Sequence, residues 1–206
     1  MKSQVTLLLI CMLFSKALSL TCQQCLPTGT SATCQPTQIT CPNQCLTSTI
    51  TAYSNGVKFT DYIQTCGTPD LCVSGSLNMG SVKVTTNSKC CSTDFCNTEK
   101  LPELPQQPPN GRMCYTCNND KCLETVSCTG DEDRCISASV QQEGISVSVK
   151  GCVSASGCAA SGSSSTPGIG VTNLQCCEGN LCNSAESFTL SFLPMIVPLL
   201  SSIFFY

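Results

Sequence analysis

Short segments in which apolar and polar residues alternate stand between the cysteines and predict β-hairpins. Residues 136–140 and 145–149 alternate apolar residues with serine, and Gln142-Glu143-Gly144 lies between them as a turn. Residues 46–65 are rich in Thr, Ile, Tyr, Val and Phe and carry Asn55-Gly56 near their middle, a dipeptide that suits a two-residue hairpin turn. Residues 81–86 predict a further strand, and the Ser-, Gly- and Ala-rich residues 159–170 predict a loop. No amphipathic helix is predicted in either half.

An apolar run at the N-terminus predicts a secretory signal peptide over residues 1–19. Lys2 provides the positive start, residues 5–14 are apolar, and Ala17-Leu18-Ser19 has the small-x-small pattern of a cleavage site. The alternative, a membrane helix, needs a longer apolar stretch, and Lys16 interrupts this one.

The C-terminus predicts a glycosylphosphatidylinositol (GPI) anchor signal over residues 184–206, removed on attachment. Residues 188–206 are apolar and uncharged, and the small residues Asn183-Ser184-Ala185 precede them. We expect the lipid at Asn183, with Ser184 as the second choice. A tail-anchored membrane protein is the alternative, although such a protein would not carry a signal peptide.

Twenty of the 21 cysteines form two sets of ten with nearly the same spacing, and Cys11 lies in the N-terminal apolar run. Each set opens with C-x-x-C (Cys22/Cys25 and Cys114/Cys117) and closes with C-C-x-x-x-x-C-N, which ends at Asn97 and Asn183. This repeat predicts two tandem domains, residues 20–97 and 113–183, with an oxidised disulfide framework in a secreted setting. Residues 98–112 contain four prolines and predict a linker that spaces the domains without locking them together. Spacing alone does not give the connectivity of the disulfides.

The composition argues against catalysis and against metal or redox cofactors. The chain has no histidine for acid–base chemistry, and no Ser/His/Asp set or phosphate-binding Gly-rich motif can be assembled. C-x-x-C pairs bind zinc elsewhere, but adjacent cysteines and an export signal favour disulfides. We therefore expect no catalytic residues, no metal and no cofactor.

The net charge of −3 is concentrated in the second domain, chiefly in Asp131-Glu132-Asp133. An acidic balance argues against nucleic acid as a partner. The acidic run leaves two interpretations open: a solvated loop, or a contact with a basic partner.

The segments Leu20–Cys25 (LTCQQC), Cys90–Asn97 (CCSTDFCN) and Cys176–Asn183 (CCEGNLCN) resemble the opening and closing motifs of the lymphocyte antigen 6 / urokinase receptor superfamily. The resemblance covers both domains and implies an all-β, small disulfide-rich fold: two tandem three-finger, snake-toxin-like domains. It implies that Asn97 and Asn183 are structural residues that bond back to the backbone. The pairs that it implies are Cys22–Cys45, Cys25–Cys34, Cys41–Cys66, Cys72–Cys90, Cys91–Cys96, Cys114–Cys135, Cys117–Cys122, Cys128–Cys152, Cys158–Cys176 and Cys177–Cys182.

Loops on a stapled base are free to vary as binding surfaces. The central fingers would be residues 46–65 and 136–151, and Tyr53, Phe59 and Tyr62 on the first are candidate partner contacts. The alternative is that these aromatic residues pack against the neighbouring finger.

The leading functional hypothesis is a non-catalytic protein-binding module on the extracellular face of the plasma membrane, GPI-anchored and acting in adhesion, ligand capture or receptor modulation. The alternative is a secreted protein that blocks an extracellular enzyme, as phospholipase inhibitors of this superfamily do. Either way the resemblance implies an extracellular protein partner, which the sequence does not name.

Overall fold

The computed structural model describes residues 19–27, 34–118, 121–142, 145–161 and 170–184. The first domain contains β1 (Leu20–Gln24), β2 (Thr37–Cys41), β3 (Gln44–Ser54), β4 (Val57–Gly67), the 3₁₀ helix η1 (Pro69–Leu71), β5 (Gly75–Asn78) and β6 (Val82–Cys91). The second contains β7 (Pro109–Asn118), β8 (Lys121–Thr129), β9 (Arg134–Gln142), β10 (Ile145–Val153), α2 (Ala155–Ser161) and β11 (Gly170–Cys177). Over these described residues the fold is all-β apart from the short helices η1 and α2, and the tandem three-finger architecture is confirmed.

The long hairpin of β3 and β4 is the central finger of the first domain. Its strands pair in register from Gln44↔Gly67 to Ser54↔Val57. Asn55 and Gly56 form the turn with φ of 50° and 80°. Two consecutive positive φ values match the right-handed twist of the strands, and Asn-Gly tolerates them.

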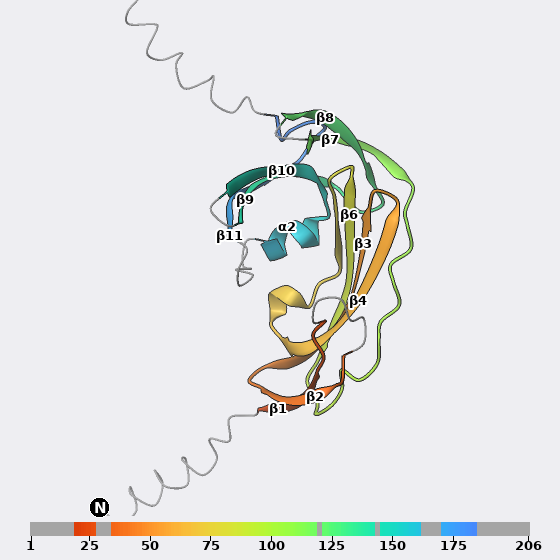
Figure 1. Ribbon diagram of the computed structural model, residues 1–206, viewed down its shortest axis with the longest axis vertical. Coiled ribbons are helices and arrows are strands. Elements are labelled where there is room, and N and C mark those ends of the chain that lie inside the picture. The colour runs from red at the N-terminus through yellow and green to blue at the C-terminus, as the bar shows by residue number, and fades with distance from the viewer. Residues whose placement is uncertain (1–18, 28–33, 119–120, 143–144, 162–169, 185–206) are drawn as a thin grey trace, which may run out of the picture.

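The two domains share one seven-stranded sheet, with strand order β11-β9-β10-β5-β6-β3-β4. Strand β5 of the first domain pairs with β10 of the second at Asn78↔Cys152 and Leu77↔Val153. Figure 1 shows the resulting arc, with β1 and β2 at one end, β7 and β8 at the other, and α2 on the inner side.

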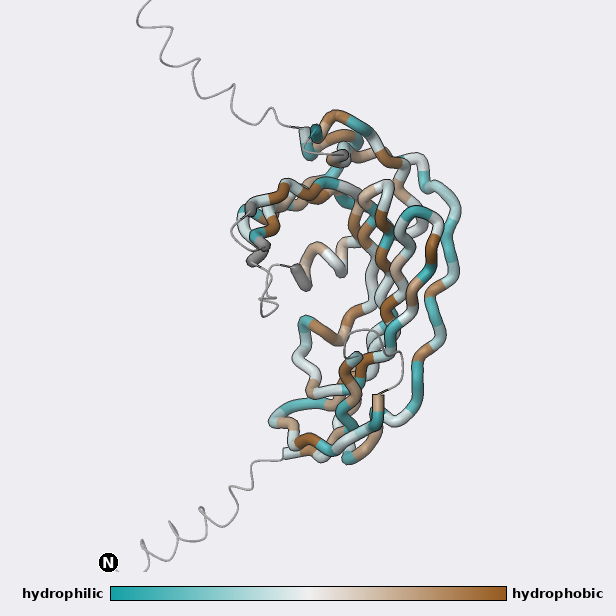
Figure 2. The backbone as a smooth tube through the Cα atoms, in the orientation of Figure 1, coloured by the Kyte–Doolittle hydropathy of each residue, from teal (hydrophilic) through white to brown (hydrophobic). Residues whose placement is uncertain are grey.

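The linker runs along the outer side of this arc, largely through hydrophilic positions (Figure 2). Thr47 and Thr49 of β3 donate hydroxyl hydrogen bonds to the carbonyl oxygens of Glu99 and Leu101, at 3.0 and 2.7 Å. The side-chain amide of Asn87 on β6 donates a hydrogen bond to the Pro102 carbonyl oxygen. The linker is therefore more than a spacer: residues 99–103 lie against the sheet because its outer face carries polar side chains that pair with the linker backbone.

A short helix, α2, occupies residues that the sequence predicted to be non-helical. The Ser154 hydroxyl accepts a hydrogen bond from the Gly157 amide at 3.2 Å, as an N-cap does, and the Cys158 amide donates to the Ser154 carbonyl. A capped helix of only seven residues needs no amphipathic pattern when neighbouring strands hold it, which is why periodicity did not reveal it. The loop predicted over residues 159–170 lies partly outside the described residues.

The buried cysteines form the centre of each domain. Cys22, Cys41 and Cys45 make one cluster, and Cys114, Cys128, Cys135 and Cys152 make the other, all fully buried. Among the described residues, no helix is long and apolar enough to span a membrane.

Candidate functional site

The ten cystines of the structure join the partners that the family resemblance implies, with Cα–Cα separations of 3.8 to 6.4 Å. Disulfide-bonded residues generally lie near this range. The pairing stays a prediction that peptide mapping under non-reducing conditions checks.

Asn97 closes the first domain. Its side chain is fully buried. Its Nδ2 donates to the carbonyl oxygens of Gln23 and Leu46, and its Oδ1 accepts from the Gln23 amide, all within 3.0 Å. The side chain therefore links β1 to β3 near the base of the fingers.

Asn183 makes the equivalent contacts in the second domain. Its Oδ1 accepts from the Tyr115 amide, and its Nδ2 donates to the carbonyl oxygens of Tyr115 and Ile136, within 3.0 Å. Its own carbonyl accepts a hydrogen bond from the buried Lys150 Nζ at 2.7 Å. Ser184, the second choice for lipid attachment, is exposed.

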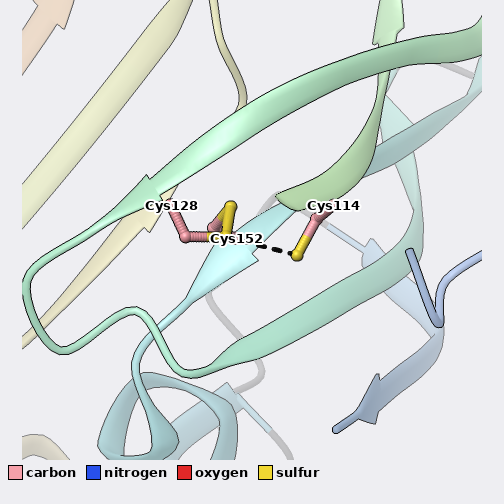
Figure 3. A group of neighbouring side chains, drawn as sticks. All are labelled: Cys114, Cys128 and Cys152. Atoms are coloured by element: carbon pink, nitrogen blue, oxygen red, sulfur yellow. Dashed lines mark hydrogen bonds between the residues drawn. A yellow bond between two sulfur atoms is a disulfide. The ribbon is translucent and has the colours of Figure 1, made fainter. Parts of the chain in front are cut away.

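Three sulfur atoms, of Cys114, Cys128 and Cys152, lie close enough together to suggest a metal site (Figure 3). Cys128 is bonded to Cys152 and Cys114 to Cys135, however. Zinc binds thiolates. The group is therefore a contact between two cystines, 3.4 Å apart at Cys114 and Cys128.

The three aromatic residues of the first central finger differ in their surroundings. Lys100 of the linker lies over the Tyr62 ring, 4.2 Å from its centre. Tyr53 is half-buried and pairs with Lys58 across the hairpin. Lys58 and Tyr62 are four residues apart on β4 and share a face, so Tyr53 lies on the same face as Tyr62. Phe59 lies on the opposite face and is 58% exposed. Phe59 is therefore the most accessible of the three aromatic residues. Tyr53 and Tyr62 are half-buried on the face of the sheet that the linker follows.

Phe59 has an apolar neighbour, Val57, which is 53% exposed and two residues away on the same strand face. Together they form the finger-tip patch, defined here as Val57 and Phe59. Because both are large apolar side chains next to the β3–β4 turn, the patch presents apolar area at the end of a rigid hairpin.

A buried acidic residue links the two domains. Glu132 is fully buried, and its Oε2 accepts hydrogen bonds from the Thr129 amide and from Asn78 Nδ2 of the first domain. Lys83 Nζ, also from the first domain, lies 3.5 Å from Glu132 Oε1 and bonds the Thr129 hydroxyl. Part of the acidic run therefore faces a basic residue of the same chain, whereas Asp131 is exposed.

Backbone contacts continue this junction along β5. The Ser76 amide donates to the Ser154 hydroxyl at 3.1 Å, and the Ser154 amide donates to the Ser76 carbonyl at 3.0 Å. A Cβ atom added at Gly151 would lie 2.3 Å from the Asn78 carbonyl oxygen. Glycine is needed here because β10 approaches the backbone of the first domain too closely for a side chain.

The inner face of the shared sheet holds a cavity of about 460 Å³ at the junction. Its floor includes Ile50, Leu77 and Val84 of the first domain and Ile136 and Val153 of the second, and the segment after β4 adds Asp70, Leu71 and Val73. Leu71 and Val73 are about 40% exposed, at 43% and 39%. Neither domain alone provides all of these walls.

A family profile described as the u-PAR/Ly-6 domain matches residues 18–99 and residues 110–185. The chain belongs to the u-PAR/Ly-6 domain family. The matches place one copy on each ten-cysteine set, so the u-PAR/Ly-6 domain occurs here as a tandem pair. The named relatives of this family are a surface receptor and phospholipase A2 inhibitors.

Two kinds of curated relative resemble this u-PAR/Ly-6 protein. The urokinase plasminogen activator surface receptor of Mus musculus is 29% identical over 66% of this chain but only 44% of its own length. A gamma-type phospholipase A2 inhibitor of Laticauda semifasciata is 31% identical over 61% of this chain and 74% of its own length. Phospholipase A2 inhibitor PIP of Malayopython reticulatus is 27% identical over 75% of this chain and 83% of its own length. The chain spans less than half the length of the receptors that it matches.

Among solved structures, the crystal structure of mouse TEX101 is similar over 79% of this chain and 97% of the TEX101 chain, with 13% sequence identity and a TM-score of 0.28.

Proposed function

We propose that this protein is a GPI-anchored module of the extracellular cell surface that captures a protein ligand through the finger-tip patch of its first domain. The observation that carries the proposal is the exposure of Val57 and Phe59 together at the end of a hairpin. Aromatic residues, phenylalanine among them, are enriched in protein interfaces relative to the rest of the surface. Membership of a family of binding proteins supports the same assignment.

The anchor would join the chain where it leaves the second domain. Attachment at Asn183 would break its peptide bond to Ser184 and form an amide with the amino group of the anchor, so the carbonyl that Lys150 binds is retained. Attachment at Ser184 would place the lipid on an exposed residue one position further. Both positions are compatible with a buried Asn183 side chain, and mass spectrometry of the C-terminal peptide distinguishes them.

Crosslinking from one defined position tests the ligand-capture proposal. A photoreactive benzoylphenylalanine in place of Phe59 should crosslink one discrete cell-surface or matrix protein. Excess unlabelled chain should compete for the crosslink, and Val57→Asp should abolish it. The matched control places the same group at Leu123, which is 80% exposed but lies on the second domain. Equal crosslinking from both positions, or none from position 59, would contradict the proposal.

A secreted inhibitor is the second candidate function. Its support is that the matches cover 74% and 83% of the two snake phospholipase A2 inhibitors, so the comparison spans most of their length. Under this hypothesis the chain would be found in the medium of expressing cells and would inhibit an added phospholipase A2. A chain held on the cell surface and inactive against the enzyme would contradict it.

A further inference from the structure

The cavity at the domain junction has the size and lining of a small-molecule site. Its volume of about 460 Å³ lies within the range of roughly 300–1,000 Å³ that is typical of ligand pockets. Its floor is the apolar inner face of the shared sheet, and Asp70, Leu71, Val73 and Gly157 also line it. Figure 1 shows α2 on this inner side of the arc. The finger-tip patch does not line this cavity, so the inference is independent of the proposed function.

The floor offers little to a peptide backbone. Two of its hydroxyl groups, those of Ser48 and Ser88, hydrogen-bond each other at 2.8 Å. Most other floor groups are aliphatic, including Ile50, Leu77 and Val84. A buried peptide brings one N–H and one C=O group with each residue, and leaving these unpaired is costly. A hydrocarbon chain brings none, so the lining favours an alkyl chain over a peptide.

The charge that the described residues place beside the cavity is negative. Among the described residues, Asp70 is the single charged group that lines it. The Asp70 carboxylate makes no hydrogen bond or ion pair with the part of the chain that the structure describes, and the residue is exposed. An anionic head group would be repelled here, and a cationic one would be attracted.

We propose that the cavity binds one single-chain amphiphile with a cationic head group. Its alkyl chain would lie over the floor formed by both domains, and its head group would lie beside Asp70. No bond is made or broken in this binding.

Calorimetry of the full mature chain with two matched probes tests the proposal. The probes are decyltrimethylammonium and decanoate, both below their micellar concentrations. We expect one-to-one binding of the cation, with an affinity about ten-fold higher than that of decanoate, because Asp70 attracts one probe and repels the other. Asp70→Asn should remove most of this difference. Asp131→Asn, at an exposed carboxylate in the second domain, is the matched control and should leave the difference unchanged.

A second variant tests the position of the head group at the wall of the cavity. Leu71→Lys places a cation beside Asp70 at an exposed position and should lower the affinity for decyltrimethylammonium while near-UV circular dichroism stays unchanged. Absence of saturable binding to the natural chain would overturn the proposal. So would equal affinity for both probes, or a charge preference that survives Asp70→Asn.

Discussion

At the residue scale, two asparagines hold the ends of the two domains. Asn97 and Asn183 each hydrogen-bond three main-chain groups, one of them at a buried contact and two at part-buried contacts. Only asparagine and glutamine side chains carry an amide with one carbonyl oxygen and two N–H donors. Glutamine is one methylene longer, so it would not fit the same contacts. The resemblance to the family indicated that these residues are structural, but only the structure identified the main-chain groups that each one bonds.

Asn97→Ala should lower the free energy of unfolding by about 2–3 kcal/mol, because it leaves buried backbone groups unpaired. Urea unfolding with disulfides intact measures the change. Asn43→Ala, at an exposed residue in the turn between β2 and β3, is the control and should change stability by less than about 0.5 kcal/mol. Similar effects of the two substitutions would show that the Asn97 contacts contribute little.

At the element scale, the linker behaves as part of the sheet's outer face. Besides the hydroxyl contacts of β3, the Lys58 ammonium of β4 pairs with Glu103, and the Thr60 hydroxyl donates to the same carboxylate. The hydrogen bond from Lys58 holds the pKa of Glu103 below its ordinary value of 4.5, and that bond also holds the pKa of Lys58 above 10.5. The contact is therefore an ion pair at neutral pH.

This pair should lose its contribution on acidification. A lowered carboxyl pKa gives stabilisation that is present above the unfolded-state value of 4.5 and is lost as the pH falls through the lower, folded value. The raised pKa of Lys58 gives stabilisation that is lost only as the pH rises through a value above 10.5. Amide chemical shifts of Thr60 and Glu103 should therefore move together as the pH falls below 4.5. In Lys58→Met their midpoint should rise toward 4.5, and an unchanged midpoint would contradict the pairing.

Periodicity predicted the hairpins because adjacent strands and their turns are encoded locally. Asn55-Gly56 and the serine alternation in residues 136–149 indicated both central fingers directly. The β5–β10 pairing was not predictable in this way, since it joins residues more than 70 positions apart through a four-residue strand. The buried Glu132 was equally hidden, because its neighbours Asp131 and Asp133 made the run look like a solvated loop.

At the scale of the whole molecule, the two domains form one curved unit rather than two separate domains on a spacer. The shared sheet, the Glu132 contacts and the packing at Gly151 all act at the same junction. The cavity has walls from both domains and therefore requires that junction to be closed.

Lys83→Met should destabilise the chain by about 3 kcal/mol, because it leaves the buried Glu132 carboxylate without its cation. Adding Glu132→Gln should restore part of the loss, since the amide is neutral. Thermal or denaturant unfolding of the single and double variants measures the coupling. Additive losses would show that the two side chains do not interact across the junction.

Gly151→Ala should open the junction, because the added methyl group would meet the Asn78 carbonyl oxygen. We expect faster amide exchange at Leu77 and Val153, the residues paired across the two domains. Ser148→Ala, on an exposed part of the same strand, is the control. Unchanged exchange in Gly151→Ala would contradict the close approach of β10 to β5.

The central claim is that this binding module works on the outer surface of the cell, held there by a lipid. The most direct test is treatment of intact cells expressing the full chain, tagged after Ser19, with phosphatidylinositol-specific phospholipase C. A chain ended after Ser184 is the control for free secretion. The account predicts surface protein before treatment and its release into the medium afterwards. Retention on treated cells, or protein in the medium before any treatment, would contradict it.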